Sequence, residues 1–106
     1  MALSLDVIFH LVEVNVFDEY MTNLFASSHN LVIIYSSNDD SLTDPAPHVR
    51  HRRFTDWIDE NQPSFEQVDM VHNPYAWDED DRQNTSFSDF YVYRKYLKPT
   101  RRSSLL

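Results

Sequence analysis

The chain has 106 residues, of which nine are basic and seventeen acidic, and its formal net charge of −8 disfavours binding to a nucleic acid phosphate backbone. It contains no glycine, where a chain of this length averages about seven, so it lacks every glycine-rich phosphate-binding loop. It has no cysteine for a disulfide or thiolate metal site and no run apolar enough for a signal peptide or membrane span, so we expect a cytoplasmic protein without a membrane partner.

The first third of the sequence predicts a strand, a helix and a second strand. Residues 2–12 are mostly apolar and indicate a buried strand that runs into a short helical turn. Asn15 is the expected N-cap of the next helix, whose apolar residues recur at helical spacing until it ends near residues 27–30. Residues 31–35 form an apolar run without alternation, which is typical of a parallel strand covered on both faces.

The rest of the sequence predicts one more helix and two more strands. The expected elements are a loop over residues 36–47, a helix around Phe54, Trp57 and Ile58, a strand over residues 65–71, an acidic loop over residues 73–86, a strand over residues 87–93 and a basic disordered tail over residues 96–106. Alternating strands and helices favour an α/β sheet with flanking helices, which forms one domain over residues 2–95. Because no apolar helix separates the last two strands, we expect the last strand to run antiparallel to the others.

Three segments carry motifs that are informative together. They read SLDVIFHLVE over residues 4–13, PHVRHRRFTDW over residues 47–57 and NTSFSDFYVYRK over residues 84–95. Their order resembles the second half of class I, Rossmann-like methyltransferases that use S-adenosylmethionine. In that family, the segment that ends the fourth strand often has a small residue, an acidic residue and two apolar residues before His-Leu. The other two segments resemble a bacterial subgroup of the family.

The resemblance implies a partial Rossmann-like methyltransferase sheet that holds the family's fourth to seventh strands, with the seventh inserted antiparallel beside the fifth. It also implies S-adenosylmethionine as the cofactor of the complete enzyme, and a small or medium-sized molecule as the methyl acceptor. The family's first strand, glycine-rich loop and ribose-binding acidic residue have no counterpart in these residues. We therefore expect a methyltransferase fragment that is inactive alone and that pairs with an N-terminal half or self-associates through an exposed sheet edge.

Open α/β sheets bind ligands beyond the carboxyl ends of their strands, and this position selects the candidate site residues. Asp6 and His10 follow the first strand and are the candidate catalytic residues. Ser4, Leu5 and Asp6 are the candidate cofactor contacts. The candidate acceptor-binding residues are Tyr35, Ser36, Asn38, His48, Arg50 and Arg53. Arginine suits an anionic acceptor because its planar fork of donors matches a carboxylate or phosphate.

Each candidate also has a purely structural interpretation. Asp6 alternatively caps a helix at the strand exit, His10 packs within an apolar run, and the basic cluster around Arg50 forms the solvated start of a helix. The acidic residues 78–81 lack the glycine and the final glutamate of a calcium-binding loop, so no metal site is expected. Two other functions remain open: a non-catalytic interaction protein or subunit, and a self-contained small α/β binding domain.

Overall fold

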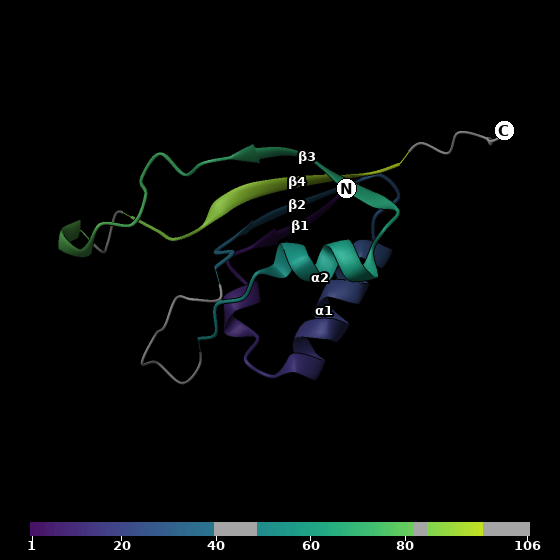
Figure 1. The fold of residues 1–106 in the computed structure, drawn as a ribbon, viewed down its shortest axis with the longest axis horizontal. Coiled ribbons are helices and arrows are strands. Elements are labelled where there is room, and N and C mark those ends of the chain that lie inside the picture. Colours follow the sequence, from purple (N-terminus) through teal and green to yellow (C-terminus); the bar gives the residue numbers. More distant parts are fainter. Residues whose placement is uncertain (40–48, 82–84, 97–106) are drawn as a thin grey trace, which may run out of the picture.

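The computed structural model describes residues 1–39, 49–81 and 85–96, which form a four-stranded sheet with two α-helices (Figure 1). The elements are β1 (Ala2–Leu5), the short 3-10 helix η1 (Ile8–His10), α1 (Val14–Ala26), β2 (Leu31–Ser36), α2 (Phe54–Asn61), β3 (Phe65–Val71), the 3-10 helix η2 (Glu79–Asp81) and β4 (Asp89–Lys95). The α/β class and the predicted order of strands and α-helices are confirmed. Residues 40–48 of the expected loop and residues 97–106 of the expected tail lie outside the described residues.

The sheet contains both parallel and antiparallel pairs. Its strand order is β1-β2-β4-β3, in which β1 and β2 pair in parallel and β4 pairs antiparallel with both of its neighbours. The helix α1 connects β1 to β2, because a parallel pair needs a long crossover. The predictions that the last strand runs antiparallel and lies beside the strand over residues 31–35 are therefore confirmed. A register shift between Gln67 and Asp69 leaves one extra residue in β3.

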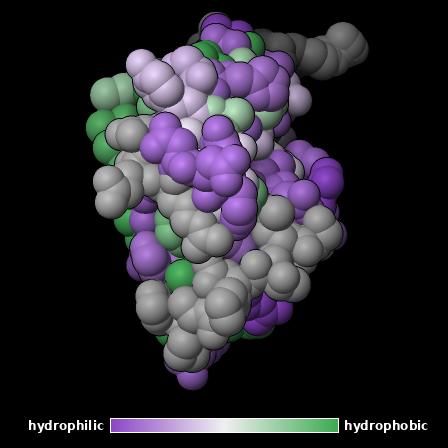
Figure 2. Space-filling model, turned by 90° about the vertical axis from the view of Figure 1, so that its left-hand side faces the viewer, coloured by the Kyte–Doolittle hydropathy of each residue, from purple (hydrophilic) through white to green (hydrophobic). Residues whose placement is uncertain are grey.

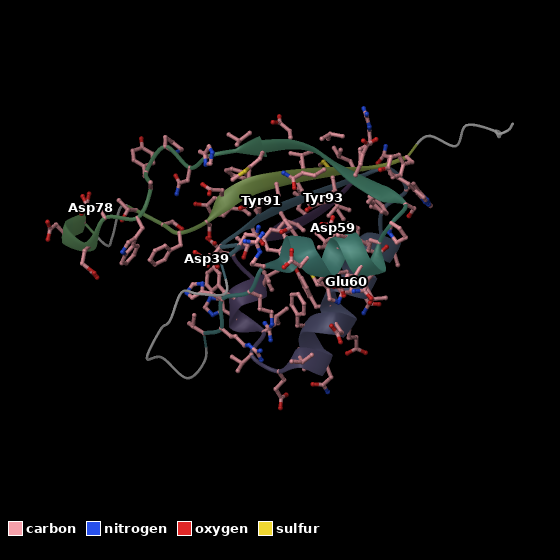
Figure 3. All side chains as sticks on the ribbon, viewed as in Figure 1. Asp39, Asp59, Glu60, Asp78, Tyr91 and Tyr93 are labelled. Atoms are coloured by element: carbon pink, nitrogen blue, oxygen red, sulfur yellow. The ribbon has the colours of Figure 1, made fainter. Side chains whose placement is uncertain are left out.

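One face of the sheet, called the covered face, packs against both helices. Val32 and Ile34 of β2 and Tyr91 and Tyr93 of β4 are buried on it, and the two tyrosines lie between β4 and α2 (Figure 3). Phe25 of α1 packs edge-on against Tyr93, with the ring centroids 6.0 Å apart. The other buried apolar residues of this core are Ala2, Ile8, Phe17, Met21, Leu24, Phe54, Ile58 and Phe65. Ring-on-ring packing between sheet and helices thus supplies most of the core.

The opposite face of the sheet, called the open face, is largely apolar but has no helix over it among the described residues. Two cross-strand rows form it: Leu3, Ile33, Val92 and Asp69 in one, and Leu5, Tyr35, Phe90 and Val71 in the other. Leu3 is 52% exposed and Leu5 is 55% exposed. The prediction that the strand over residues 31–35 is covered on both faces is therefore wrong for the described residues, because Ile33 and Tyr35 are only half-buried.

The helix α1 begins one residue before its predicted cap. Val14 is its first residue, so Asn15 lies inside the helix and its predicted N-cap role is wrong. The segment before the helix is bound by a residue that is distant in the sequence. The Arg52 guanidinium donates a hydrogen bond to the Val12 carbonyl oxygen at 2.8 Å. The predicted helical spacing of the apolar residues is confirmed by the burial of Phe17 and of three residues beyond it. No helix in the described part of the chain has the length and apolar character that a membrane crossing needs.

Candidate functional site

The carboxyl ends of β1 and β2 and the start of β4 meet at one edge of the sheet. We call this edge the rim; it consists of residues 6–10, 36–38, 49–53 and 85–88. Figure 2 views the molecule from this end, where hydrophilic residues dominate the described surface. Because ligands of open α/β sheets bind beyond the carboxyl ends of strands, the rim is the first place to look for a site.

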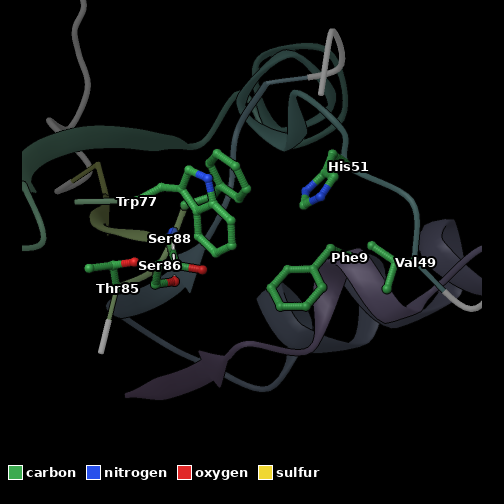
Figure 4. Close-up of a pocket in the computed structure, with 8 residues that line it drawn as sticks. Phe9, Val49, His51, Trp77, Thr85, Ser86 and Ser88 are labelled. Carbon is green, nitrogen blue, oxygen red and sulfur yellow. Dashed lines mark hydrogen bonds between the residues drawn. The ribbon is translucent and has the colours of Figure 1, made fainter. Parts of the chain in front are cut away.

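An aromatic cavity of about 200 Å³ opens at the rim (Figure 4). It is lined by Phe9, Val49, His51, Trp77, Thr85, Ser86, Phe87 and Ser88. The rings of Trp77 and Phe87 stack on one side, with centroids 4.5 Å apart and planes 19° apart. Phe9 and His51 lie on the other side, with ring centroids 5.7 Å apart. None of the lining residues carries a carboxylate, ammonium or guanidinium group.

His51 is anchored in this cavity by the end of β2. Its Nδ1 lies 2.7 Å from the Oγ of Ser37, whose side chain is buried. The His51 ring also meets Phe87 edge-on, at 5.9 Å between centroids. Next to Ser37, the Oγ of Ser36 is buried without a hydrogen-bond partner among the described residues. The candidate acceptor-binding residue Ser36 thus precedes the serine that anchors His51 but does not line the cavity itself.

Asp6, a candidate catalytic residue, lies at the rim with an uncommon backbone conformation. Its φ of 56° is the one positive value among the described residues, and that region is disfavoured for residues with a Cβ. Its N–H donates to the Tyr35 carbonyl oxygen at 2.8 Å, and its Oδ1 accepts a hydrogen bond from Ser88 Oγ at 2.7 Å. Ser88 is buried and lines the cavity, so the Asp6 carboxylate is one hydrogen bond away from it.

His10, the other candidate catalytic residue, does not line the cavity but lies beside a residue that does. It lies exposed in η1, with its ring centroid 4.6 Å from that of Phe9. Phe9 in turn lines the cavity. The structure therefore brings both predicted catalytic residues to the rim and places each of them next to a residue of the cavity wall.

Two candidate acceptor-binding residues form hydrogen bonds within the protein. Asn38 Oδ1 accepts from the backbone N–H of Thr55 at 3.2 Å, and Asn38 Nδ2 donates to the Thr55 hydroxyl at 2.9 Å. Thr55 lies in the first turn of α2, whose free backbone N–H groups need such acceptors. The Tyr35 hydroxyl accepts from Asn73 Nδ2 at 3.1 Å, and the Tyr35 ring packs against the tilted ring of Phe90 on the open face.

The basic cluster binds to its own chain. Arg52 donates to the carbonyl oxygens of Leu11 and Val12, and its guanidinium lies 4.5 Å from the centroid of the Phe17 ring. Burial lowers the pKa of Arg52, and the nearby charge of Arg50 lowers it further. Arg50 Nη1 also donates to the Val12 carbonyl oxygen, at 3.4 Å. These contacts fix the turn between η1 and α1.

The remaining candidates of this cluster differ in their surroundings. Arg53 forms an exposed ion pair with Asp56, with 3.3 Å between Nε and Oδ2. Such an exposed pair stabilises the fold by less than about 1 kcal/mol and opens readily. His48 lies outside the described residues. Arg50 and Arg53 are therefore the exposed arginines of the cluster, whereas Arg52 is partly buried.

The candidate cofactor contacts at the end of β1 point in different directions. Ser4 is buried on the covered face, where its Oγ accepts a hydrogen bond from the Tyr20 hydroxyl at 2.8 Å. Leu5 is exposed on the open face, and only Asp6 reaches the rim. Alternate residues of a strand face opposite sides, so these three side chains do not form one surface.

The aromatic residues of the cavity are functional candidates that reasoning from the sequence missed. None of Phe9, Trp77 and Phe87 is among the site residues predicted from the sequence. The signal that was available is the position of Phe9, four residues after the end of β1, and of Phe87, two residues before the start of β4. Among the described residues, no group of histidine and acidic side chains is arranged to hold a metal ion.

The chain matches no protein-family model, no curated protein and no solved structure.

Proposed function

We propose that this chain is the acceptor-binding half of a Rossmann-like methyltransferase that uses S-adenosylmethionine. The observation that carries the proposal is the sheet, in which β4 lies antiparallel between β2 and β3. In the family that the three sequence motifs resemble, the fourth to seventh strands have the same arrangement. The motifs themselves do not specify which strands become neighbours, so the strand pairing is a second line of support for the proposal.

The uncovered surfaces of the sheet also support a half-domain. Sheets made of parallel strands alone are almost always covered on both faces. The pair β1 and β2 is parallel, yet Leu3 and Leu5 are exposed on the open face. Within the described residues, β1 also has no strand on its other edge. In the proposed domain, an N-terminal half adds strands beside β1 and helices over the open face, and so removes both exposures.

The residues at the end of β1 do not fit S-adenosylmethionine without that other half. Ser4 is bound to Tyr20 on the covered face, while Leu5 faces the opposite side. The chain also has no glycine for a close turn around the cofactor. When bound to the complete enzyme, the cofactor supplies an electrophilic methyl group, and the residues described above bind and orient the acceptor.

We assign the chemistry of this half to the rim. The acceptor is held in the cavity, where alignment with the methyl donor provides most of the rate acceleration. Asp6 accepts a proton if the acceptor loses one on methylation, and Ser88 holds its Oδ1 in place. His10 is the second candidate base on this rim. Arg53 is the candidate contact for an anionic group of the acceptor.

A non-catalytic interaction subunit is the alternative function, and the open face favours it. The two proposals differ in what a completed sheet does. In calorimetric titrations, the chain alone should bind no S-adenosylmethionine, whereas the chain combined with an N-terminal half that carries the glycine-rich loop should bind it. Failure of the combined protein to bind would favour the interaction subunit. Micromolar binding by a monomer of this chain alone would overturn the half-domain proposal.

A further inference from the structure

We propose that the rim cavity binds a single uncharged aromatic ring that carries a hydroxyl group, and that this ring belongs to the methyl acceptor. The cavity binds such a ring whether or not methyl transfer follows. Only the role of the ring as acceptor rests on the proposed function.

The size of the cavity limits the ligand to one ring or two fused rings. Its volume is about 200 Å³. A protein cavity of roughly 150 Å³ accommodates benzene, whereas pockets for drug-sized molecules measure about 300 Å³ or more. A nucleotide or a peptide segment is therefore too large to be enclosed, although a larger acceptor can insert one ring.

The chemistry of the walls selects a planar, uncharged group. Trp77, whose ring stacks on that of Phe87, faces Phe9 across the cavity (Figure 4). Aromatic rings pack on one another in stacked or edge-on geometries, and these contacts favour a planar ring over a saturated one of equal size. A charged ligand would lose its water without gaining an opposite charge, because no lining residue carries a carboxylate, ammonium or guanidinium group.

Among the polar groups of the wall, His51 offers a ring nitrogen for recognition. Thr85 Oγ1 donates to the Asp81 carbonyl oxygen, Ser86 Oγ accepts from the Ser88 N–H, and Ser88 Oγ donates to Asp6. The Nδ1 of His51 is engaged with Ser37, which leaves Nε2. Depending on the tautomer, Nε2 is a donor or an acceptor, and a phenolic hydroxyl can complement either.

Phenol is the probe for this site, and nuclear magnetic resonance of the isotope-labelled chain is the readout. We expect phenol to bind with a dissociation constant on the order of 1 mM and to shift the indole N–H signal of Trp77. Trp57, the other tryptophan, packs near Phe17 and Phe25 and should not respond. Cyclohexanol should bind at least about threefold more weakly because it lacks the planar ring. Benzoate should not bind.

Two variants with matched controls locate the bound ring. Phe87→Leu should weaken phenol binding about fivefold, whereas Phe90→Leu should leave it unchanged. The two phenylalanines are 40% and 38% exposed, but Phe90 lies on the open face. His51→Phe should weaken phenol binding about fivefold and leave benzene binding unchanged, because only the hydroxyl contact is lost.

Several results would overturn the ring site. These are equal binding of phenol and cyclohexanol, equal effects of the Phe87 and Phe90 variants, or a shift confined to Trp57. If Phe87→Leu unfolds, magnetisation transfer from phenol protons to the rings of Phe9 and Trp77 in the unchanged chain decides the question. If the ring binds but the completed enzyme takes up no S-adenosylmethionine, the proposed function fails and the ring site stands. If the completed enzyme binds the cofactor but methylates no ring-containing acceptor, the acceptor assignment fails.

Discussion

The two faces of the sheet are built from alternate residues of the same strands, yet only one face is buried. On β4, Tyr91 is 6% exposed on the covered face, while the adjacent Phe90 is 38% exposed on the open face. A strand face that meets water usually carries polar residues, but Leu3 and Leu5 of β1 are both apolar and exposed. The difference shows that apolar side chains on a strand face can pack against a layer of helices. The described residues supply such a layer for one face only.

The largest expected effect is on the free energy of unfolding, which should depend more on the covered face than on the open face. Phe25→Ala should lower the free energy of unfolding by about 3–5 kcal/mol, because it removes a buried ring that contacts Phe65 and Tyr93. Phe90→Ala on the open face should lower it by less than about 1 kcal/mol. Urea unfolding measures both. Equal losses would mean that another chain covers the open face in solution.

Alkaline pH should unfold the protein by ionising the covered face. Burial raises the pKa of Tyr91 and Tyr93, and the charges of Asp89 and Asp59 raise the two values further. The folded state therefore favours the neutral hydroxyls. Stability should be constant up to about pH 10, where tyrosine ionises in the unfolded chain, and should fall as the pH rises above it. Thermal melting followed by circular dichroism measures the decline, which Tyr93→Phe should reduce; an unchanged pH profile in that variant would contradict the assignment.

The open face and the edge of β1 with which no described strand pairs should drive self-association. An apolar face next to an unpaired strand edge recruits another chain, so light scattering should detect species larger than the monomer. Leu5→Lys should shift the chain toward the monomer and change the free energy of unfolding by less than about 0.5 kcal/mol. Val14→Lys is the control, since Val14 is 54% exposed but lies on α1. A monomeric parent chain, or equal effects of both variants, would show that the open face tolerates water.

The sequence predicted the strands and helices well because their signals are local. The apolar run over residues 31–35 and the helical spacing from Phe17 onward each suffice to indicate an element. The start of α1 was misplaced because its N-cap residue, Glu13, makes no side-chain capping hydrogen bond and so gives no local signal in the sequence. The exposure of Ile33 was missed because the number of layers around a strand is a property of the whole fold.

The candidate site also has one part that the sequence predicted and one part that it did not. Asp6 was found by its position at the end of a strand, and the structure places it at the rim. The cavity was not found, because Phe9, His51, Trp77 and Phe87 come from separate segments that only the folded chain brings together. Their types alone are as typical of a core as of a site.

A change in stability smaller than that of Phe25→Ala is expected at Asp6, which joins the end of β1 to the start of β4. Asn tolerates the left-handed backbone and keeps a side-chain oxygen for the Ser88 hydroxyl, so Asp6→Asn should change the free energy of unfolding by less than about 1 kcal/mol. Asp6→Ala loses both features and should lower it by about 1–3 kcal/mol. Thermal melting of the two variants tests this order. An amide cannot accept a proton, so in the completed enzyme Asp6→Asn should reduce turnover about 100-fold or more despite its stability. Full turnover in Asp6→Asn would show that Asp6 has only a structural role, in which it joins two strands.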